Sequence, residues 1–396
     1  MRGIVVPDRN EDFTADPVEL FFDLGYVLAF SQLVGHLVHH PTWVGVGEAA
    51  LLFWLLWLPW QQFTWSANAV SGNGRLVRLL FLVGAATSIP MAASVSTAFD
   101  DGGPVFAISL AVIQLLAVAT LSLAIALDQG GGVRSAILRW STLSLAAMAV
   151  LIVGAFLDDG ARVVAWLLAT VVIVVAMIDA GRGEWIIRTG HFAERHGLIV
   201  IIALGEVIVA IGSPVVATLE AGEGLAASTV VALVGVGVFA GALWWAYFDR
   251  PGPALEHRGE RIDGGHQRGR YARDVYTISH APLVAGIILA AAGLEEIALH
   301  PDDPVPTAFR AMLGGGLALG VVGVSAAVWR AFRVAARERL VAELALAALL
   351  VAARDVDGAW VVVLVDLVLV AALLVEHARI EGPHPAADVA APVSGG

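Results

Sequence analysis

The sequence predicts an all-α membrane protein that crosses the bilayer many times. Of its 396 residues, 58% are hydrophobic and only 15% are charged, whereas a soluble protein carries about 25% charged residues. Apolar stretches of about 20 residues, the length that spans a bilayer as a helix, recur along the whole chain. Together these observations exclude a large soluble domain.

Twelve apolar segments divide the chain. Their approximate ranges are 18–38, 43–66, 77–98, 104–127, 135–157, 162–180, 195–218, 226–248, 271–299, 306–332, 338–353 and 358–377. The segment 338–353 is the shortest. We expect residues 1–16 to be a cytoplasmic N-terminal segment, residues 250–270 a charged, glycine-rich cytosolic loop, and residues 381–396 a disordered tail.

The charges predict the orientation and limit the partners. With the N-terminus inside, 20 of the 23 arginines lie on the cytoplasmic side, and only Arg162, Arg310 and Arg354 lie outside, which is the bias of cytoplasmic loops. An even number of spans then puts both chain ends in the cytoplasm. The net charge of −12 argues against a nucleic acid partner, so the lipid bilayer is the expected partner. The absence of cysteine excludes disulfides and thiolate metal sites.

Three pairs of segments suggest an internal repeat. VELFFDLGYVLAFSQL at 18–33 matches HFAERHGLIVIIALGEVIVAIG at 191–212, LPWQQFTW at 58–65 matches LWWAYFDR at 243–250, and IPMAAS at 89–94 matches APLVAG at 281–286. The pairs occur in the same order. We therefore predict two six-helix pseudo-repeats, residues 17–183 and 184–380, related by an axis along the membrane normal. The first helices of the two repeats would face each other.

The first segment carries four polar groups that lipid disfavours. Glu19 and Asp23 share one face near its cytoplasmic end, where the helix dipole also favours carboxylates. Gln32 and His36 share a face closer to the outer side, and the nine residues between Asp23 and Gln32 turn the helix by about 180°. One pore cannot be lined by both pairs. All four are candidates for an ion pathway, and some of them must bind neighbouring helices instead.

Glu206 is the sharpest candidate for a transport site. It lies near mid-bilayer in the apolar sequence VIIALGEVIVAIG, and a carboxyl group at that depth costs about 2.5–3.5 kcal/mol or more. A carboxyl that gains and loses a proton there would serve proton coupling. The alternative is a protonated glutamate that hydrogen-bonds across a helix contact made close by Gly205 and Gly212. His280 and Pro282 interrupt the ninth segment, which predicts a kink, and His280 is a further pathway candidate.

A second charged group stands at the start of the seventh segment. His191, Glu194 and Arg195 share a helix face, with His196 beside them. We expect this group to form a salt-bridge network with Glu19 and Asp23 at an inner mouth, to which Asp249 also contributes by pairing with Arg250 or Arg273. His and Glu on one face can ligate zinc, but no third ligand is specified. We therefore predict no metal and no cofactor.

The chain resembles the bacterial low temperature requirement protein A (LtrA) family over nearly its whole length. VELFFDLGYVLAFSQL, GHFAERHGLIVIIALGEVIVAIG, LWWAYFDR and ARDVYTISHAPLVAGIILAAAGLE carry the resemblance. It implies a multi-pass protein of the bacterial inner membrane whose family name comes from a requirement for growth in the cold. It supplies no reaction and no transported substrate. The chain departs from the family at Gly25-Tyr26 and at Val207, which stands where serine is common beside Glu206.

These observations favour a permease or channel for a cation or a proton-coupled small solute. The sequence contains no P-loop, no HExxH and no GxSxG motif, so an enzyme is the weaker hypothesis. Two alternatives stay open. One is an intramembrane enzyme or lipid-handling protein with a cleft beside His280 or Glu206, and the other is a membrane sensor or scaffold that docks partners through residues 250–273.

Overall fold

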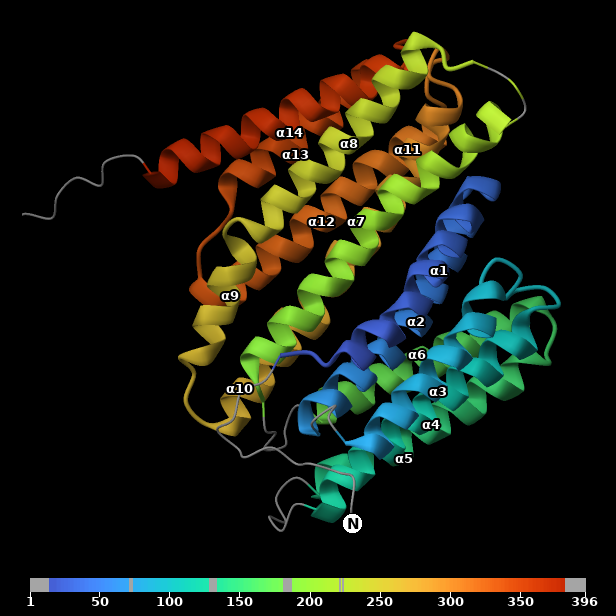
Figure 1. Ribbon diagram of the computed structural model, residues 1–396, viewed down its shortest axis with the longest axis vertical. Coiled ribbons are helices and arrows are strands. Elements are labelled where there is room, and N and C mark those ends of the chain that lie inside the picture. Colours follow the sequence, from blue (N-terminus) through green and yellow to red (C-terminus); the bar gives the residue numbers. More distant parts are fainter. Residues whose placement is uncertain are drawn as a thin grey trace, which may run out of the picture.

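The computed structural model describes residues 14–70, 74–127, 134–180, 187–220, 222 and 224–381. Most of the predicted N-terminal segment and tail, residues 1–13 and 382–396, lie outside these ranges. Every regular element within them is helical (Figure 1). The first half forms α1 (Pro17–His39), α2 (Trp43–Ala69), α3 (Arg75–Ala93), α4 (Gly103–Leu127), α5 (Arg134–Ala155) and α6 (Asp159–Ala180). The second half forms α7 (Thr189–Glu220), α8 (Ala227–Phe248), α9 (Pro251–Glu260), α10 (Gly265–Ala272), the π-helix η1 (Arg273–Ile278), α11 (Ser279–Leu299), α12 (Thr307–Phe332), α13 (Arg337–Ala352) and α14 (Gly358–Glu381).

The helices have the length and composition of membrane spans. Within the described ranges, 11 of them are long and apolar enough to cross a bilayer, and each of the 12 predicted segments contains a helix. The exception in length is α13, with 16 residues, which is short for the roughly 20 residues that a span needs. Large apolar side chains such as Leu344 and Val351 are 72% and 77% exposed. Such exposure fits a lipid solvent, so the all-α, polytopic membrane fold is confirmed.

The chain packs as two groups of helices that meet at α1 and α7 (Figure 1). In the first group α1 packs on α3, and α3, α4, α5 and α6 pack in succession; in the second, α7 packs on α11, and α11, α12, α13 and α14 pack in succession. The matching order of neighbours is what a repeat requires. The two-repeat organisation itself stays a prediction.

Glycines allow the closest helix contact of the second group, between α11 and α12. A Cβ atom at Gly316 would lie 2.5 Å from the carbonyl oxygen of Gly286, and one at Gly286 would lie 2.4 Å from the carbonyl oxygen of Gly316. No side chain fits at either position, since backbone meets backbone there.

The structure corrects the prediction of a loop over residues 250–270. This segment folds into α9 and α10, because Leu255 and Tyr271 are 1% and 2% exposed and bury the two short helices against the bundle. The Tyr271 hydroxyl donates a hydrogen bond of 2.6 Å to the Leu255 carbonyl. Glycine and arginine dominate the local composition, so hydropathy alone gave no sign of these helices.

An irregular turn precedes α11. Pro282 has no N–H to donate and its ring crowds the carbonyl of Ile278, one turn earlier. The π-helix η1 occupies that preceding turn, from Arg273 to Ile278. Extra residues inserted by π-turns re-aim side chains and often occur at functional sites. Here the turn places Thr277 and His280 in the interior, where both are 1% exposed.

Candidate functional site at the interface of α1 and α7

Four ionisable side chains meet between α1 and α7, and we call Glu19, Asp23, His191 and Arg195 the α1–α7 cluster. Arg195 donates two hydrogen bonds to Asp23, from Nη1 to Oδ2 at 2.8 Å and from Nη2 to Oδ1 at 2.9 Å. His191 Nε2 lies 2.9 Å from Glu19 Oε2, and Trp60 Nε1 donates to Asp23 Oδ1 at 2.8 Å. None of the five side chains is more than 1% exposed. The predicted salt-bridge network of His191 and Arg195 with Glu19 and Asp23 is confirmed.

Local helix geometry sets this arrangement. Glu19 and Asp23 are four residues apart on α1, as are His191 and Arg195 on α7, so each pair occupies one helix face. Glu19 also closes the N-terminus of α1: its Oε1 accepts a hydrogen bond from the Asp16 amide at 3.2 Å, completing a capping box. The same carboxylate therefore fixes the start of α1 and binds α7.

The other predicted members of the inner-mouth group lie apart from the α1–α7 cluster. Glu194 Oε2 accepts a hydrogen bond of 2.6 Å from the amide of Ala15, just ahead of α1. Asp249 ends α8 and pairs with Arg250 at 3.3 Å, one of its two expected partners. His196 faces α2 instead, as described next. Among the described residues, no group of three His, Asp or Glu side chains is placed to hold a metal ion.

His196 ends a chain of hydrogen bonds between α2, α7 and η1. The indole Nε1 of Trp65 can only donate, and it donates to Thr277 Oγ1 at 3.1 Å. The Thr277 hydroxyl then donates to Gln61 Oε1 at 2.9 Å, which turns the Gln61 amide nitrogen toward His196 Nε2 at 2.9 Å. His196 Nε2 must accept, so the ring proton is on Nδ1 and is donated to the Phe192 carbonyl at 2.8 Å. The network thus specifies a neutral His196.

His280 repeats this arrangement one helix away. Its Nδ1 donates to the Val275 carbonyl at 2.9 Å, and its Nε2 lies 2.7 Å from the hydroxyl of Tyr247 on α8. The ring centres of His280 and His196 are 5.1 Å apart. The two imidazoles therefore lie side by side, and polar groups extend from Trp65 on α2 to Tyr247 on α8.

Glu206 has different surroundings from all these groups. It is 1% exposed, yet neither of its carboxylate oxygens makes a hydrogen bond of normal geometry within the described part of the chain, although Ser31 of α1 lies beside it. A Cβ atom at Gly205 or Gly212 would meet no heavy atom within 4 Å. The alternative of a hydrogen bond across a close glycine contact is therefore not supported at these two glycines.

Gln32 and His36 also find partners close to their own helix. Gln32 Oε1 accepts a hydrogen bond of 3.1 Å from Ser96 Oγ, and His36 Nε2 lies 3.2 Å from Glu48 Oε2. These contacts tie α1 to the end of α3 and to the start of α2. They do not join Gln32 or His36 to Glu206.

Sequence reasoning missed four members of the polar interior, namely Trp60, Gln61, Tyr247 and Thr277. Tryptophan in a span is typical of packing and of the membrane interface, whereas Trp60 and Trp65 also donate hydrogen bonds here. A usable signal was present in the two adjacent glutamines, Gln61 and Gln62, since amides are costly inside an apolar span.

The comparisons with known proteins agree with this architecture. The family model described as "Bacterial low temperature requirement A protein (LtrA)" matches residues 14–375. The chain belongs to the LtrA family. An LtrA-related relative in Rhizobium meliloti (strain 1021), named only as an uncharacterised protein, is 31% identical over 312 residues, which cover 74% of this chain and 72% of the relative. No solved structure matches this LtrA protein.

Proposed function

We propose that this LtrA protein is a permease of the bacterial inner membrane that moves protons or another cation, alone or with a small solute. The observation that carries the proposal is Glu206, a buried carboxyl group that has no charged partner among the described residues and whose nearest polar neighbour is the Ser31 hydroxyl. A carboxyl group in a membrane span is costly unless it is protonated or paired. A proton or a bound cation supplies the missing partner.

The remaining candidates take roles according to their position in the fold. Glu206 is the proton or cation site. The α1–α7 cluster forms the inner side of the path, and Glu194, His196 and Asp249, which lie apart from it, contribute to the same inner region. Gln32 and His36 lie toward the outer side, and His280 lies beside the path in α11. The arginine bias supports cytoplasmic chain ends.

Transport requires a conformation in which Glu206 meets water. Glu206 is buried in this conformation, which therefore corresponds to the occluded state of the transport cycle. The protein opens when α7 moves against α1, where the two groups of helices meet. Movement of one helix bundle against another around a fixed site is a common route to alternating access. The α1–α7 cluster then acts as the inner contact that closes.

The direct test measures proton flux in liposomes. The purified protein is reconstituted with a pH-sensitive dye inside, and a potassium gradient with valinomycin drives proton entry. We expect flux in the parent and its loss in Glu206→Gln, since an amide cannot release a proton at this depth. Asp101→Asn, in an exposed connector, is the matched control for removal of one acidic charge. Unchanged flux in Glu206→Gln, with the variant incorporated as well as the parent, removes Glu206 from the mechanism.

Water access to Glu206 has its own test, which the sequence makes simple. The chain contains no cysteine, so all labelling by a thiol reagent comes from the single introduced cysteine. We expect Glu206→Cys to react with a charged methanethiosulfonate reagent in membranes, and Ala203→Cys, one turn away and 0% exposed, to resist it. Asp101→Cys, in an exposed connector, shows that the reagent is active. If Glu206→Cys is as resistant as Ala203→Cys, no wet route reaches this position.

The family description supports extending the proposal to growth in the cold. A deletion strain complemented with the parent gene is expected to grow at low temperature, and one complemented with Glu206→Gln is expected to fail. The readout requires no knowledge of the solute. Equal growth of both strains separates the cold phenotype from Glu206.

A further inference from the structure

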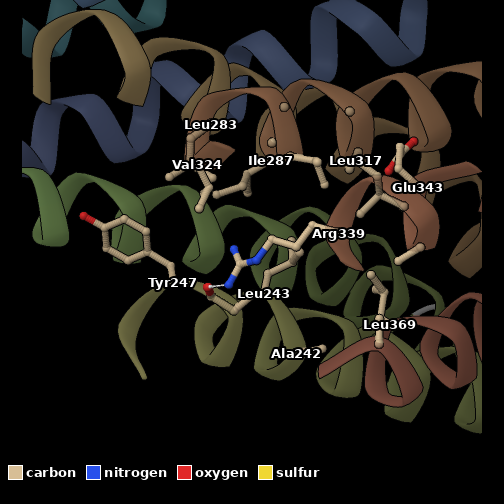
Figure 2. A pocket seen from close by; sticks show the side chains of 18 of the residues that line it. Ala242, Leu243, Tyr247, Leu283, Ile287, Leu317, Val324, Arg339, Glu343 and Leu369 are labelled. Atoms are coloured by element: carbon tan, nitrogen blue, oxygen red, sulfur yellow. Dashed lines mark hydrogen bonds between the residues drawn. The ribbon is translucent and has the colours of Figure 1, made fainter. Parts of the chain in front are cut away.

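A large apolar cavity lies in the second group of helices, away from Glu206. Side chains of α7, α8, α11, α12, α13 and α14 surround it, and its empty volume, including the part open to the surroundings, is about 850 Å³. Its walls are mostly aliphatic or glycine, as Leu243, Leu283, Ile287, Leu317 and Leu369 illustrate in Figure 2.

Three charged side chains line this cavity, namely Arg339, Glu343 and Glu376, and two of them also belong to a polar pocket beside it. A smaller polar pocket of about 250 Å³ adjoins it and shares Arg339, Leu373 and Glu376 with it. Arg339 extends across the cavity toward α8, where it donates to the Ala246 carbonyl at 2.8 Å, and it also pairs with Glu376 at 3.1 Å (Figure 2). The polar pocket adds the Arg250–Asp249 pair. Its two arginines and two carboxylates balance in charge, and His377, which lies 3.2 Å from Arg250, also lines it.

The polar end is accessible and the apolar end is sheltered. The side chains of Asp249 and Arg250 are 36% and 32% exposed, whereas Leu283 and Leu317 are 8% and 4% exposed. Trp245 lines the polar pocket, and tryptophan favours the level of lipid head groups. The short α13 forms part of the wall, and its 16 residues reach only about 24 Å of the roughly 30 Å hydrocarbon thickness. Along this wall, α13 therefore covers only part of the hydrocarbon thickness.

We propose that this site binds a zwitterionic phospholipid of the surrounding bilayer, with one acyl chain in the apolar cavity and the head group in the polar pocket. Arginine suits the phosphate because its planar fork donates to two oxygens. Glu376 and Asp249 suit the ammonium group of the same head group. A site of zero net charge favours a lipid of zero net charge over an anionic one, since an anionic head group leaves a carboxylate of the pocket without its cation.

The site is connected to the polar interior through one residue. Tyr247 lines the cavity, and its hydroxyl is hydrogen-bonded to His280. A lipid in the cavity would therefore contact Tyr247, the residue that is hydrogen-bonded to His280 beside His196. This binding site does not depend on the transport proposal, and its test reads lipid binding rather than flux.

The apolar part is tested by filling it. Native mass spectrometry of the delipidated protein, titrated with palmitoyl-oleoyl phosphatidylethanolamine, counts bound lipids. We expect one high-affinity lipid in the parent and an affinity lower by about tenfold or more in Ala372→Leu and Gly320→Leu, which place side chains in the cavity. A Cβ at Gly320 would meet only Leu283, at 3.9 Å, so this variant should fold.

Ala371→Leu is the matched control, because Ala371 is exposed on the same helix and does not line the cavity. It should bind lipid as the parent does. Equal binding in the parent, Ala371→Leu, Ala372→Leu and Gly320→Leu, all monodisperse by size exclusion, overturns the site. Equal loss in Ala371→Leu and Ala372→Leu also overturns it, since cavity filling would then not be the cause.

The polar part is tested by exchanging head groups and one arginine. Phosphatidylethanolamine should bind more tightly than phosphatidylglycerol with the same chains, and a free fatty acid should bind more weakly than either. Arg339→Gln should weaken phospholipid binding by about tenfold, the loss of a charge-assisted pair, whereas Arg337→Gln, exposed on the same helix, should not. Preference for phosphatidylglycerol, or equal effects of the two arginine variants, contradicts the zwitterion assignment.

Discussion

Helix α7 carries two kinds of buried ionisable group, and their surroundings differ. Near its start, Arg195 and His191 are hydrogen-bonded to carboxylates of α1 at 2.8–2.9 Å. Three turns later, Glu206 is just as buried, but among the described residues no basic side chain pairs with it, and Ser31 is the polar side chain beside it. Both regions are disfavoured by lipid.

We expect the paired groups near the start of α7 to contribute to stability, and Glu206 to contribute to function instead. A buried charge with a bonded partner is costly to break, since removal of one partner leaves the other uncompensated. A buried carboxyl group without a charged partner adds no ion pair to the fold. Stability therefore does not explain why a carboxyl group lies at this position. Three substitutions test this comparison, from the largest expected loss of stability to the smallest.

Asp23→Asn should be the most damaging of the three. It leaves Arg195 buried with only Glu19 nearby, at 3.7 Å, and breaking a buried ion pair costs about 3–5 kcal/mol. The loss is measured as a lower midpoint of denaturant or thermal unfolding in detergent, followed by tryptophan fluorescence. The asparagine still accepts from Trp60, so the change isolates the charge.

The double variant Asp23→Asn with Arg195→Gln is the control for this prediction. It removes both charges, and replacing a buried ion pair as a whole is often close to neutral. We expect it to recover most of the lost stability. A double variant as unstable as Asp23→Asn alone would show that the ion pair is not what holds α1 to α7.

Gln61→Leu should have an intermediate effect. It leaves His196 Nε2 and Thr277 Oγ1 without their bonds to the amide, and each unsatisfied buried group costs about 1–3 kcal/mol. The adjacent Gln62→Leu is the comparison, because Gln62 makes one long contact of 3.4 Å to Ser144 and its Oε1 has no partner in the described structure. The same unfolding measurement should rank Gln61→Leu well below Gln62→Leu in stability. The reverse ranking would contradict the hydrogen-bond chain.

The sequence predicted the spans well, because lipid imposes a hydropathy pattern that each segment carries by itself. It also predicted which faces of α1 and α7 meet, since Glu19 with Asp23 and His191 with Arg195 are each spaced by four residues. It did not predict the partners of His196 and His280, because Gln61, Thr277 and Tyr247 come from distant spans whose packing no local pattern encodes. The helices α9 and α10 were missed for a related reason: contacts of Leu255 and Tyr271 with the bundle stabilise them, not their own propensity.

Glu206→Gln should change stability least. It is the same exchange of carboxyl for amide as Asp23→Asn, but it breaks no charged pair, so we expect a change within about 1 kcal/mol, since the amide's polar groups find no more partners than the carboxyl's did. The unfolding midpoint of this variant is to be measured beside that of Asp23→Asn under identical conditions. A loss as large as that of Asp23→Asn would mean that Glu206 has a bonded partner and holds helices together. A stable protein that has lost proton flux would instead assign Glu206 to transport, because its carboxyl group would matter for the movement of ions and not for the fold.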